Sequence, residues 1–188
     1  MNVTGFRVIA WGLLLVVLDF NINGFDLLPD WLGYIIIISG CHQLSNQLSY
    51  SQFRHANLAA YALLFIYIVN ILMLFSATSD STIGLIDGIM SVMMIVFMYY
   101  ICDGLFHFAQ SIQESEFSQA VRRNWLFYFI ANLIALISQP LLLLNSSFSI
   151  IMVVLIITVV LSTLFIIFKL FKAAKFHLPP TPTDHSSL

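Results

Sequence analysis

The most informative absence in this 188-residue sequence is that of charge. Only 9% of the residues are charged and 60% are hydrophobic, whereas soluble globular domains carry about 25% charged residues. A chain of this composition cannot cover its surface with polar groups, so water is excluded as its main solvent. Cysteine is scarce as well. Cys41 and Cys102 are the only two, which is too few for a disulfide-bonded scaffold.

Signatures of known enzymes are also missing. The sequence contains no GxSxG, no HExxH and no glycine-rich phosphate loop. Both cysteines lie in apolar segments, where a reactive thiolate is disfavoured. We therefore expect no catalytic residue, no cofactor and no nucleic-acid partner, and an intramembrane enzyme is the least favoured class. Met90, Met93, Met94 and Met98 resemble a soft-metal ladder, but methionine at helical spacing is more often a packing residue, so a metal site stays open.

What the sequence does contain is a series of long apolar runs. A helix needs about twenty residues to cross the hydrocarbon core of a bilayer. Backbone groups in lipid must pair internally, which favours helices for runs without alternating polarity. We expect an all-α, polytopic membrane protein in which residues 1–175 form one domain and 176–188 a disordered tail. Its six expected spans are Val3–Phe20, Leu28–Leu44, Ala56–Phe75, Ile83–Cys102, Trp125–Leu144 and Phe148–Phe171.

Basic residues are sorted to one side of these spans. With six spans, all seven Lys and Arg residues fall on the side that also carries both termini. The positive-inside rule then predicts a cell-membrane protein whose termini are both cytoplasmic. The three outer connections (NINGFDL, SATSDST and NSS) are short and predict hairpins. The connection over 103–124 is the longest, and its loosely helical spacing predicts either an extension of the fourth helix or a segment at the interface.

Carboxylates collect on the opposite, outer side, where no Lys or Arg can neutralise them. They are Asp19, Asp26, Asp30, Asp80 and Asp87. Part of this set has a structural explanation. Asp26 follows an Asn-Gly turn at the position of a helix N-cap, and Asp30 in the first turn faces the positive end of the helix dipole. Trp31 and Tyr34 fit the role of interface anchors.

Asp87 is the residue that most favours a functional site. It lies about one turn inside the fourth expected span, where a carboxylate is costly unless it faces protein or a wet cavity. The helical spacing places Asp80, Gly84, Asp87 and Ser91 on one face, and Gly84 and Gly88 form a GxxxG pattern that permits close helix packing. We therefore expect this face to turn inward.

Other polar residues fall at a similar depth. Asn70 lies near the outer end of the third span, and Asn132 and Gln139 share a stripe of the fifth with Tyr128. Together with Asp19 and Asp87, these side chains predict an outward-facing acidic chamber. The candidate ligand-binding residues are Asp87, Asp19, Asp30, Asp26, Asn70 and Gln139. For Asn70, Asn132 and Gln139, ordinary hydrogen bonds between helices are the favoured explanation.

The run INGFDLLPDWLGYIIIISG, within Leu18 to Gly40, resembles one found in small, uncharacterised multi-pass membrane proteins of Gram-positive bacteria. That resemblance covers the first two spans and implies no activity. In length and number of spans the chain is also similar to the substrate-binding subunits of energy-coupling-factor vitamin transporters, which is an analogy of fold alone. Their Ala-x-x-x-Ala coupling face is not reproduced here, where the first span has Ala10 with Gly5 and Gly12.

Two functions follow from these observations. In the first, the bundle binds or transports a cation or a small polar solute through the acidic chamber, with Asp87 and Asp19 as primary ligands. In the second, the chain is a non-catalytic accessory or regulatory protein that packs against a membrane-protein partner or another copy of itself. The lipid bilayer is the expected surroundings in both cases.

Overall fold

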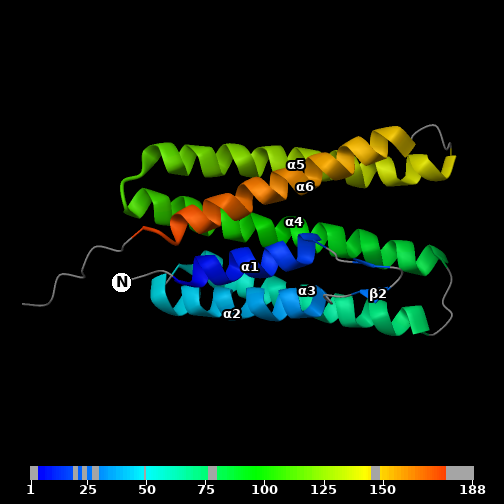
Figure 1. The fold of residues 1–188 in the computed structure, drawn as a ribbon, viewed down its shortest axis with the longest axis horizontal. Helices are drawn as coiled ribbons and strands as arrows, with labels where there is room; N and C mark the ends of the chain where they lie inside the picture. The colour runs from blue at the N-terminus through cyan, green and yellow to red at the C-terminus, as the bar shows by residue number, and fades with distance from the viewer. Residues whose placement is uncertain are drawn as a thin grey trace, which may run out of the picture.

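The computed structural model describes residues 4–18, 21–22, 25–26, 30–48, 50–75, 80–144 and 149–176. Within these residues the chain is helical apart from one two-stranded hairpin, in which Asn21 pairs with Asp26 and Ile22 with Phe25. Six helices account for most of the sequence (Figure 1). The elements are α1 Thr4–Leu18, β1 Asn21–Ile22, β2 Phe25–Asp26, α2 Asp30–Leu48, α3 Ser51–Phe75, α4 Asp80–Ser111, α5 Ser115–Leu144 and α6 Ser149–Ala173.

The helices form a closed ring. Each packs against its neighbours in sequence, and α1 also contacts α6, which joins the two ends of the series. Figure 1 shows all six running lengthwise, with the start of α1 and the end of α6 at the same end of the bundle. The starts of α3 and α5 lie there too, so every basic residue falls at this end, which we call the basic end.

The tightest contact in the ring is the one between α1 and α2. Two glycines on each helix, seven residues apart, meet as the pairs Gly5–Gly40 and Gly12–Gly33. A Cβ added to Gly12 would lie 2.8 Å from the carbonyl oxygen of Gly33, and one added to Gly5 would lie 2.9 Å from that of Gly40. Atoms this close leave no room for a side chain, so the two backbones touch directly.

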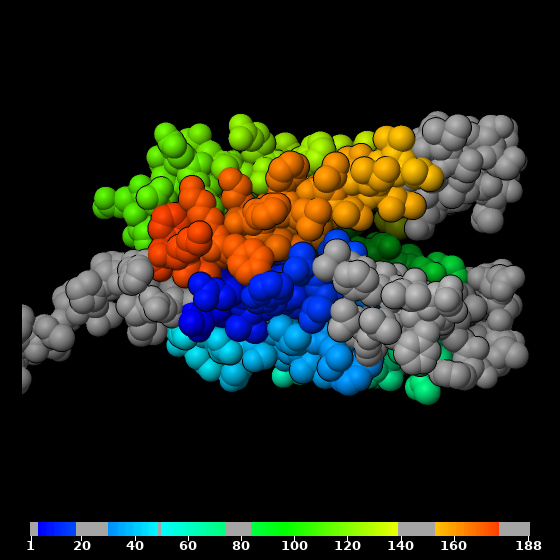
Figure 2. All heavy atoms as spheres, viewed as in Figure 1, coloured from blue at the N-terminus to red at the C-terminus, as the bar shows by residue number. Residues whose placement is uncertain are grey.

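Contacts with α6 hold the other side of α1. The rings of Trp11 and Phe171 meet edge to face with centroids 5.5 Å apart. Figure 2 shows the atoms of α1 filling the space between α2 and α6. Helix α1 therefore packs on α2 through direct backbone contact and on α6 through aromatic side chains.

Aromatic side chains fill the ring at its basic end. Phe6 of α1 lies 5.7 Å from Phe53 of α3 and 5.0 Å from Phe108 of α4, measured between ring centroids, and all three are fully buried. Gly104 makes space for the ring of Phe53, which lies 2.7 Å from where its Cβ would be. These contacts tie three helices together across the centre of the ring.

The connection between the fourth and fifth helices is much shorter than expected. Continuous helix extends α4 to Ser111 and starts α5 at Ser115, which confirms the alternative in which this segment prolongs the fourth helix. The turn is a Schellman motif. Glu114 N–H donates to Ala109 and Gln113 N–H to Gln110, each at 3.0 Å, and Gln113 has a left-handed φ of 61°. Both helices therefore continue past the segments that hydropathy had marked.

Two details of the hairpin and tail also differ from the sequence predictions. The prediction that Asp26 caps a helix is wrong, because Asp26 pairs with Asn21 in the hairpin and α2 begins only at Asp30. Asp30 does lie in the first turn of α2, as expected. The predicted disordered tail lies outside the described residues from 177 onward. Phe176, its first expected residue, packs on Phe117 with ring centroids 5.5 Å apart.

Four helices are long and apolar enough to cross a membrane, by length and composition: Ser51–Met73, Gly84–Ser111, Ser115–Ser138 and Val153–Ala173. A shorter apolar helix covers Thr4–Val17. Large apolar side chains also point away from the bundle. Leu58, Phe65 and Phe168, for example, are 67–69% exposed. This architecture is consistent with a helical membrane protein, because a water-soluble monomer rarely exposes so continuous an apolar surface.

The glycine pairs give a direct test of the packing. We expect Gly12→Ala and Gly40→Ala each to lower the free energy of unfolding by about 1–3 kcal/mol, the usual cost of forcing extra atoms into a packed contact. Gly84→Ala and Gly88→Ala serve as matched controls, because a Cβ at either site meets nothing within 4 Å among the described residues. The measurement is the unfolding of the detergent-solubilised protein, and equal effects in all four variants would contradict the backbone contact.

Candidate functional site

A cavity of about 270 Å³ lies inside the ring, beyond the aromatic core of the basic end. It is bounded by α1, α2, α4, α5 and α6. Most of its wall is apolar, and the polar groups are spaced around it. The lining residues are Leu13, Val17, Tyr34, Met90, Ser91, Met94, Met98, Tyr128, Asn132, Val159, Val160 and Thr163.

The polar groups of this wall differ in their hydrogen bonding. Ser91 donates to the carbonyl of Asp87, and Thr163 to that of Val159, each over 2.9 Å, so both hydroxyl protons stay within their own helices. Asn132 Nδ2 likewise donates to Tyr128 O at 2.9 Å. The amide oxygen of Asn132 and the phenol groups of the two tyrosines are then the polar atoms that the wall offers to a solute. An apolar site with a few placed polar groups is typical of small-molecule binding.

Asn70 and Asp87, which the sequence places at a similar depth, are in contact in the structure. Asn70 Nδ2 on α3 donates to Asp87 Oδ1 on α4 over 3.2 Å. The Oδ1 atom of Asn70 is buried and has no hydrogen-bond partner among the described residues. Asp87 itself is exposed and does not line the cavity. Of the face that was expected to turn inward, Ser91 reaches the cavity, whereas Asp87 belongs to the contact between α3 and α4.

The remaining predicted residues lie in different places. Asp30 lies on α2 one helical turn before Tyr34 and is not among the residues that line the cavity. Asp19 lies outside the described residues. Asp26 is in β2 and Gln139 is in α5, but the positions of their side chains lie outside the description.

Gly84 and Gly88 do not mark a close helix contact within this chain. A Cβ at either position meets nothing within 4 Å among the described residues, and Gly84 is exposed. The close approach that was expected at this GxxxG pattern occurs instead between α1 and α2. Sequence spacing alone did not distinguish the glycines of α4 from those of α1 and α2, because a glycine permits close packing only where another helix passes.

Tyr34 is the main residue whose place in the site was missed. It was expected to be an interface anchor, but it is only 2% exposed, lines the cavity and packs on Tyr67 with ring centroids 5.8 Å apart. Trp31, three residues earlier, is 40% exposed and keeps an outward position. The helical spacing of Tyr34 with the buried Ile37, Ile38 and Cys41 was the available signal.

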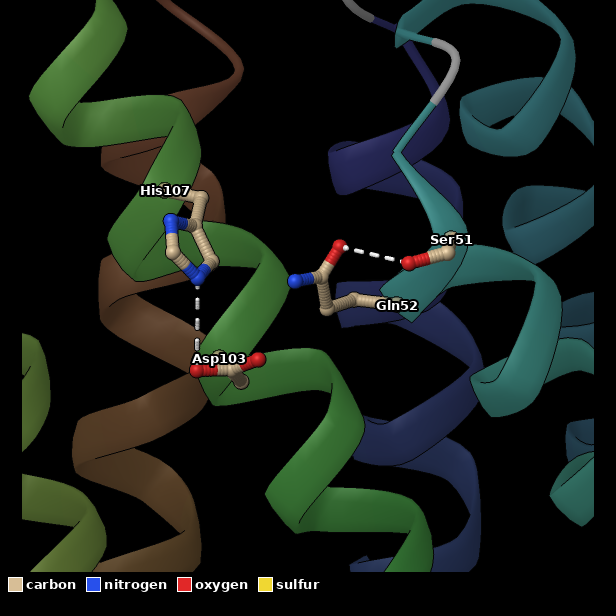
Figure 3. A network of polar contacts seen from close by, with 4 residues as sticks. All are labelled: Ser51, Gln52, Asp103 and His107. Carbon is tan, nitrogen blue, oxygen red and sulfur yellow. Dashed lines mark hydrogen bonds and ion pairs between the residues drawn. The ribbon is translucent and has the colours of Figure 1, made fainter.

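Polar contacts also occur near the basic end, away from the cavity. His107 and Asp103, one turn apart on α4, lie 3.7 Å apart as an ion pair when the histidine is protonated (Figure 3). Ser51 and Gln52 at the start of α3 form a hydrogen bond of 3.4 Å between their side chains. No three His, Cys, Asp or Glu side chains gather as a metal site would require in the part of the chain that the structure describes.

No protein-family model, no curated protein and no solved structure matches this chain. The cavity and its surroundings are therefore the basis for a function, and the resemblance over the first two helices stays a prediction.

The Asn70–Asp87 contact can be measured by a double-mutant cycle. We expect Asn70→Ala and Asp87→Ala to be coupled by about 0.6 kcal/mol, the usual size of a hydrogen bond between membrane helices. Asn132→Ala combined with Asp87→Ala is the control pair and should be additive, because Asn132 donates to its own helix. Unfolding in mixed micelles provides the energies, and full additivity of the first pair would contradict the contact.

Proposed function

We propose that the chain is an integral membrane protein with six spans, with both termini in the cytoplasm. Four helices have the length and hydropathy of membrane spans, and α1 and α2 pair along their length as an antiparallel hairpin in the same ring. The concentration of all seven Lys and Arg residues at the basic end supports the orientation. The basic end then faces the cytoplasm and the carboxylates of the other end face outward.

Reporter fusions test this topology. Fusions after Asn23, Ser79 and Ser146 should report an external location, because each follows a helix that runs away from the basic end. A fusion after Gln113, in the turn between α4 and α5, should report a cytoplasmic location. A cytoplasmic signal from any of the first three fusions would contradict the six-span arrangement.

We propose further that the protein binds a small solute from the outer side, as a transporter or a subunit of one. The observation that carries this proposal is the cavity of about 270 Å³ inside the ring, whose wall combines apolar side chains with Tyr34, Tyr128 and Asn132. Among the described residues, its lining contains no carboxylate and no basic residue. An inorganic ion would lose its hydration shell there, whereas an organic solute also gains contacts with the apolar wall, so a small organic solute is the better match.

The sign of the surrounding charge narrows the solute class. The outer end carries five aspartates and no basic residue, and such a field raises the local concentration of cations. Tyrosine faces attract an organic ammonium group, and the polarizable methionines of α4 adapt to its apolar part. We therefore favour a small organic amine. Asp87 and Asp30 would attract it, and the cavity would hold it.

Thermal stability in detergent tests solute binding. A panel of organic amines, their neutral isosteres and matched acids should contain an amine that raises the melting temperature, because a ligand at 100 times its Kd adds about 2.7 kcal/mol to the free energy of unfolding. Asn132→Leu should abolish this gain. Asn57→Leu is the control, because Asn57 is also partly buried but lies on α3 outside the cavity. Stabilisation that survives Asn132→Leu would place the solute elsewhere.

The second candidate is an accessory membrane protein that packs against a partner. The open surface around Gly84 and Gly88 favours it, because a helix from another chain has space to approach there. The same experiment separates the two candidates. If no solute in the panel shifts the melting temperature, and a specific membrane protein copurifies with the wild type but is lost in Gly88→Leu, the accessory role replaces solute binding.

A further inference from the structure

A second, separate site lies on the hairpin of α4 and α5 near the basic end. Two adjoining cavities of about 360 and 560 Å³ share Phe106 and Arg122, so together they form one groove, which we call the hairpin groove. The first cavity is lined by Tyr99, Cys102, Asp103, Phe106, Arg122 and Trp125. Beyond the two shared residues, the second is lined by Gln110, Gln113, Ser115, Ser118 and Gln119.

Arg122, at the junction, is exposed and forms no ion pair with another residue that the structure describes. Asp103 lines the same cavity but lies nearest to His107, at 3.7 Å. A guanidinium group without an ion-pair partner is suited to an anion. Its planar set of donors matches two oxygens of a phosphate group, which makes arginine a preferred phosphate ligand.

The groove lies at the depth of lipid headgroups if the helices span the membrane as proposed. The sequence predicts that the fourth span ends at Cys102 and the fifth starts at Trp125, although the apolar helix α4 continues to Ser111 and α5 begins at Ser115. On α4, Asp103 is the first charged residue past that boundary, and on α5 Arg123 and then Arg122 follow it. Tyr99 and Trp125, whose ring centroids are 5.5 Å apart, lie on its membrane side, as amphipathic aromatic rings do at membrane interfaces.

The two cavities differ in chemistry along this axis. The membrane-side cavity is aromatic, and its one carboxylate, Asp103, is paired with His107. The cavity farther out presents three glutamines and two serines, and no carboxylate lines it among the described residues. Neutral amides and hydroxyls bind hydroxyl groups well.

We propose that the hairpin groove binds a phospholipid with an uncharged polyol headgroup, of the phosphatidylglycerol type, from the cytoplasmic leaflet. Arg122 binds the phosphate. The glycerol headgroup lies against Gln110 and Gln119, and the first part of the acyl chains packs on Tyr99 and Trp125. This inference rests on the proposed membrane embedding but is independent of solute binding in the central cavity.

Native mass spectrometry of the full chain tests the phosphate contact. The protein is released from micelles that contain equal amounts of phosphatidylglycerol and phosphatidylethanolamine. We expect the wild type to retain phosphatidylglycerol, and Arg122→Gln to lower the bound fraction about ten-fold, the effect of losing one strong charge-assisted hydrogen bond. Arg123→Gln is the matched control, since Arg123 is also exposed but lines neither cavity. Equal losses in both variants would overturn the site in favour of general surface charge.

The headgroup is tested separately. Gln110→Ala with Gln119→Ala should remove the preference for phosphatidylglycerol over phosphatidylethanolamine while total bound lipid is kept. Equal binding of the two lipids by the wild type would overturn the polyol assignment. If soluble glycerol phosphate bound with the same affinity as the lipid, the membrane-side cavity would contribute nothing to the affinity. This result would overturn a lipid as the occupant. Unchanged melting temperatures of the variants confirm folding. Reporter fusions test the topology separately, so a wrong membrane embedding can be distinguished from a wrong lipid site.

Discussion

Direct backbone contact between α1 and α2 is the constraint on which the rest of the structure depends. Glycines at matching seven-residue intervals remove the side chains that would hold the two helices apart. Because α1 and α2 lie so close, α6 can reach the opposite face of α1 and close the ring. With larger residues at these positions α1 would be displaced, and its inward side chains, Phe6 and Leu13, would move with it.

The closed ring is filled unevenly along its length. At the basic end, Phe6, Phe53 and Phe108 meet across the centre of the ring. Farther along, slimmer side chains such as Leu13 and Val17 of α1 face the methionines of α4, and the cavity opens between them. One architecture thus combines an aromatic core at the basic end with a cavity farther along the ring. Tyrosine and asparagine side chains place hydrogen-bonding groups in that space without putting a charge there.

The sequence predicted the number and order of the helices because each is an apolar run with turn residues on either side. Their ends were less predictable. Hydropathy marks the part of a helix that fits in lipid, whereas helical hydrogen bonding continues as long as the backbone permits, as it does from Cys102 to Ser111. α4 ends at Ser111, and the turn that follows holds Gln113 at a left-handed φ of 61°, a conformation that usually favours glycine. No local sequence pattern therefore indicated how tight this turn is.

The candidate site was predicted only in part, for a related reason. Depth in the membrane follows from position along a helix, and it paired Asn70 with Asp87 correctly. The direction in which a side chain points depends on which helices are neighbours, and that is a property of the whole ring. The roles of Tyr34 and of the α1 glycines could not be predicted without knowing which helices are neighbours. In a single helix, Tyr34 looks like an interface anchor and the glycines look like ordinary small residues. Their packing roles arise only from the helices that lie beside them.

Ring closure by the first and last helices has a consequence for how the molecule is made. Synthesis delivers α1 at the beginning and α6 at the end, yet Trp11 and Phe171 must meet before the wall is complete. Until then, Tyr128 and Asn132 of α5 have no helix opposite them on that side. A nascent chain therefore carries an open seam through most of its synthesis, and the 25-residue helix α6 closes the ring.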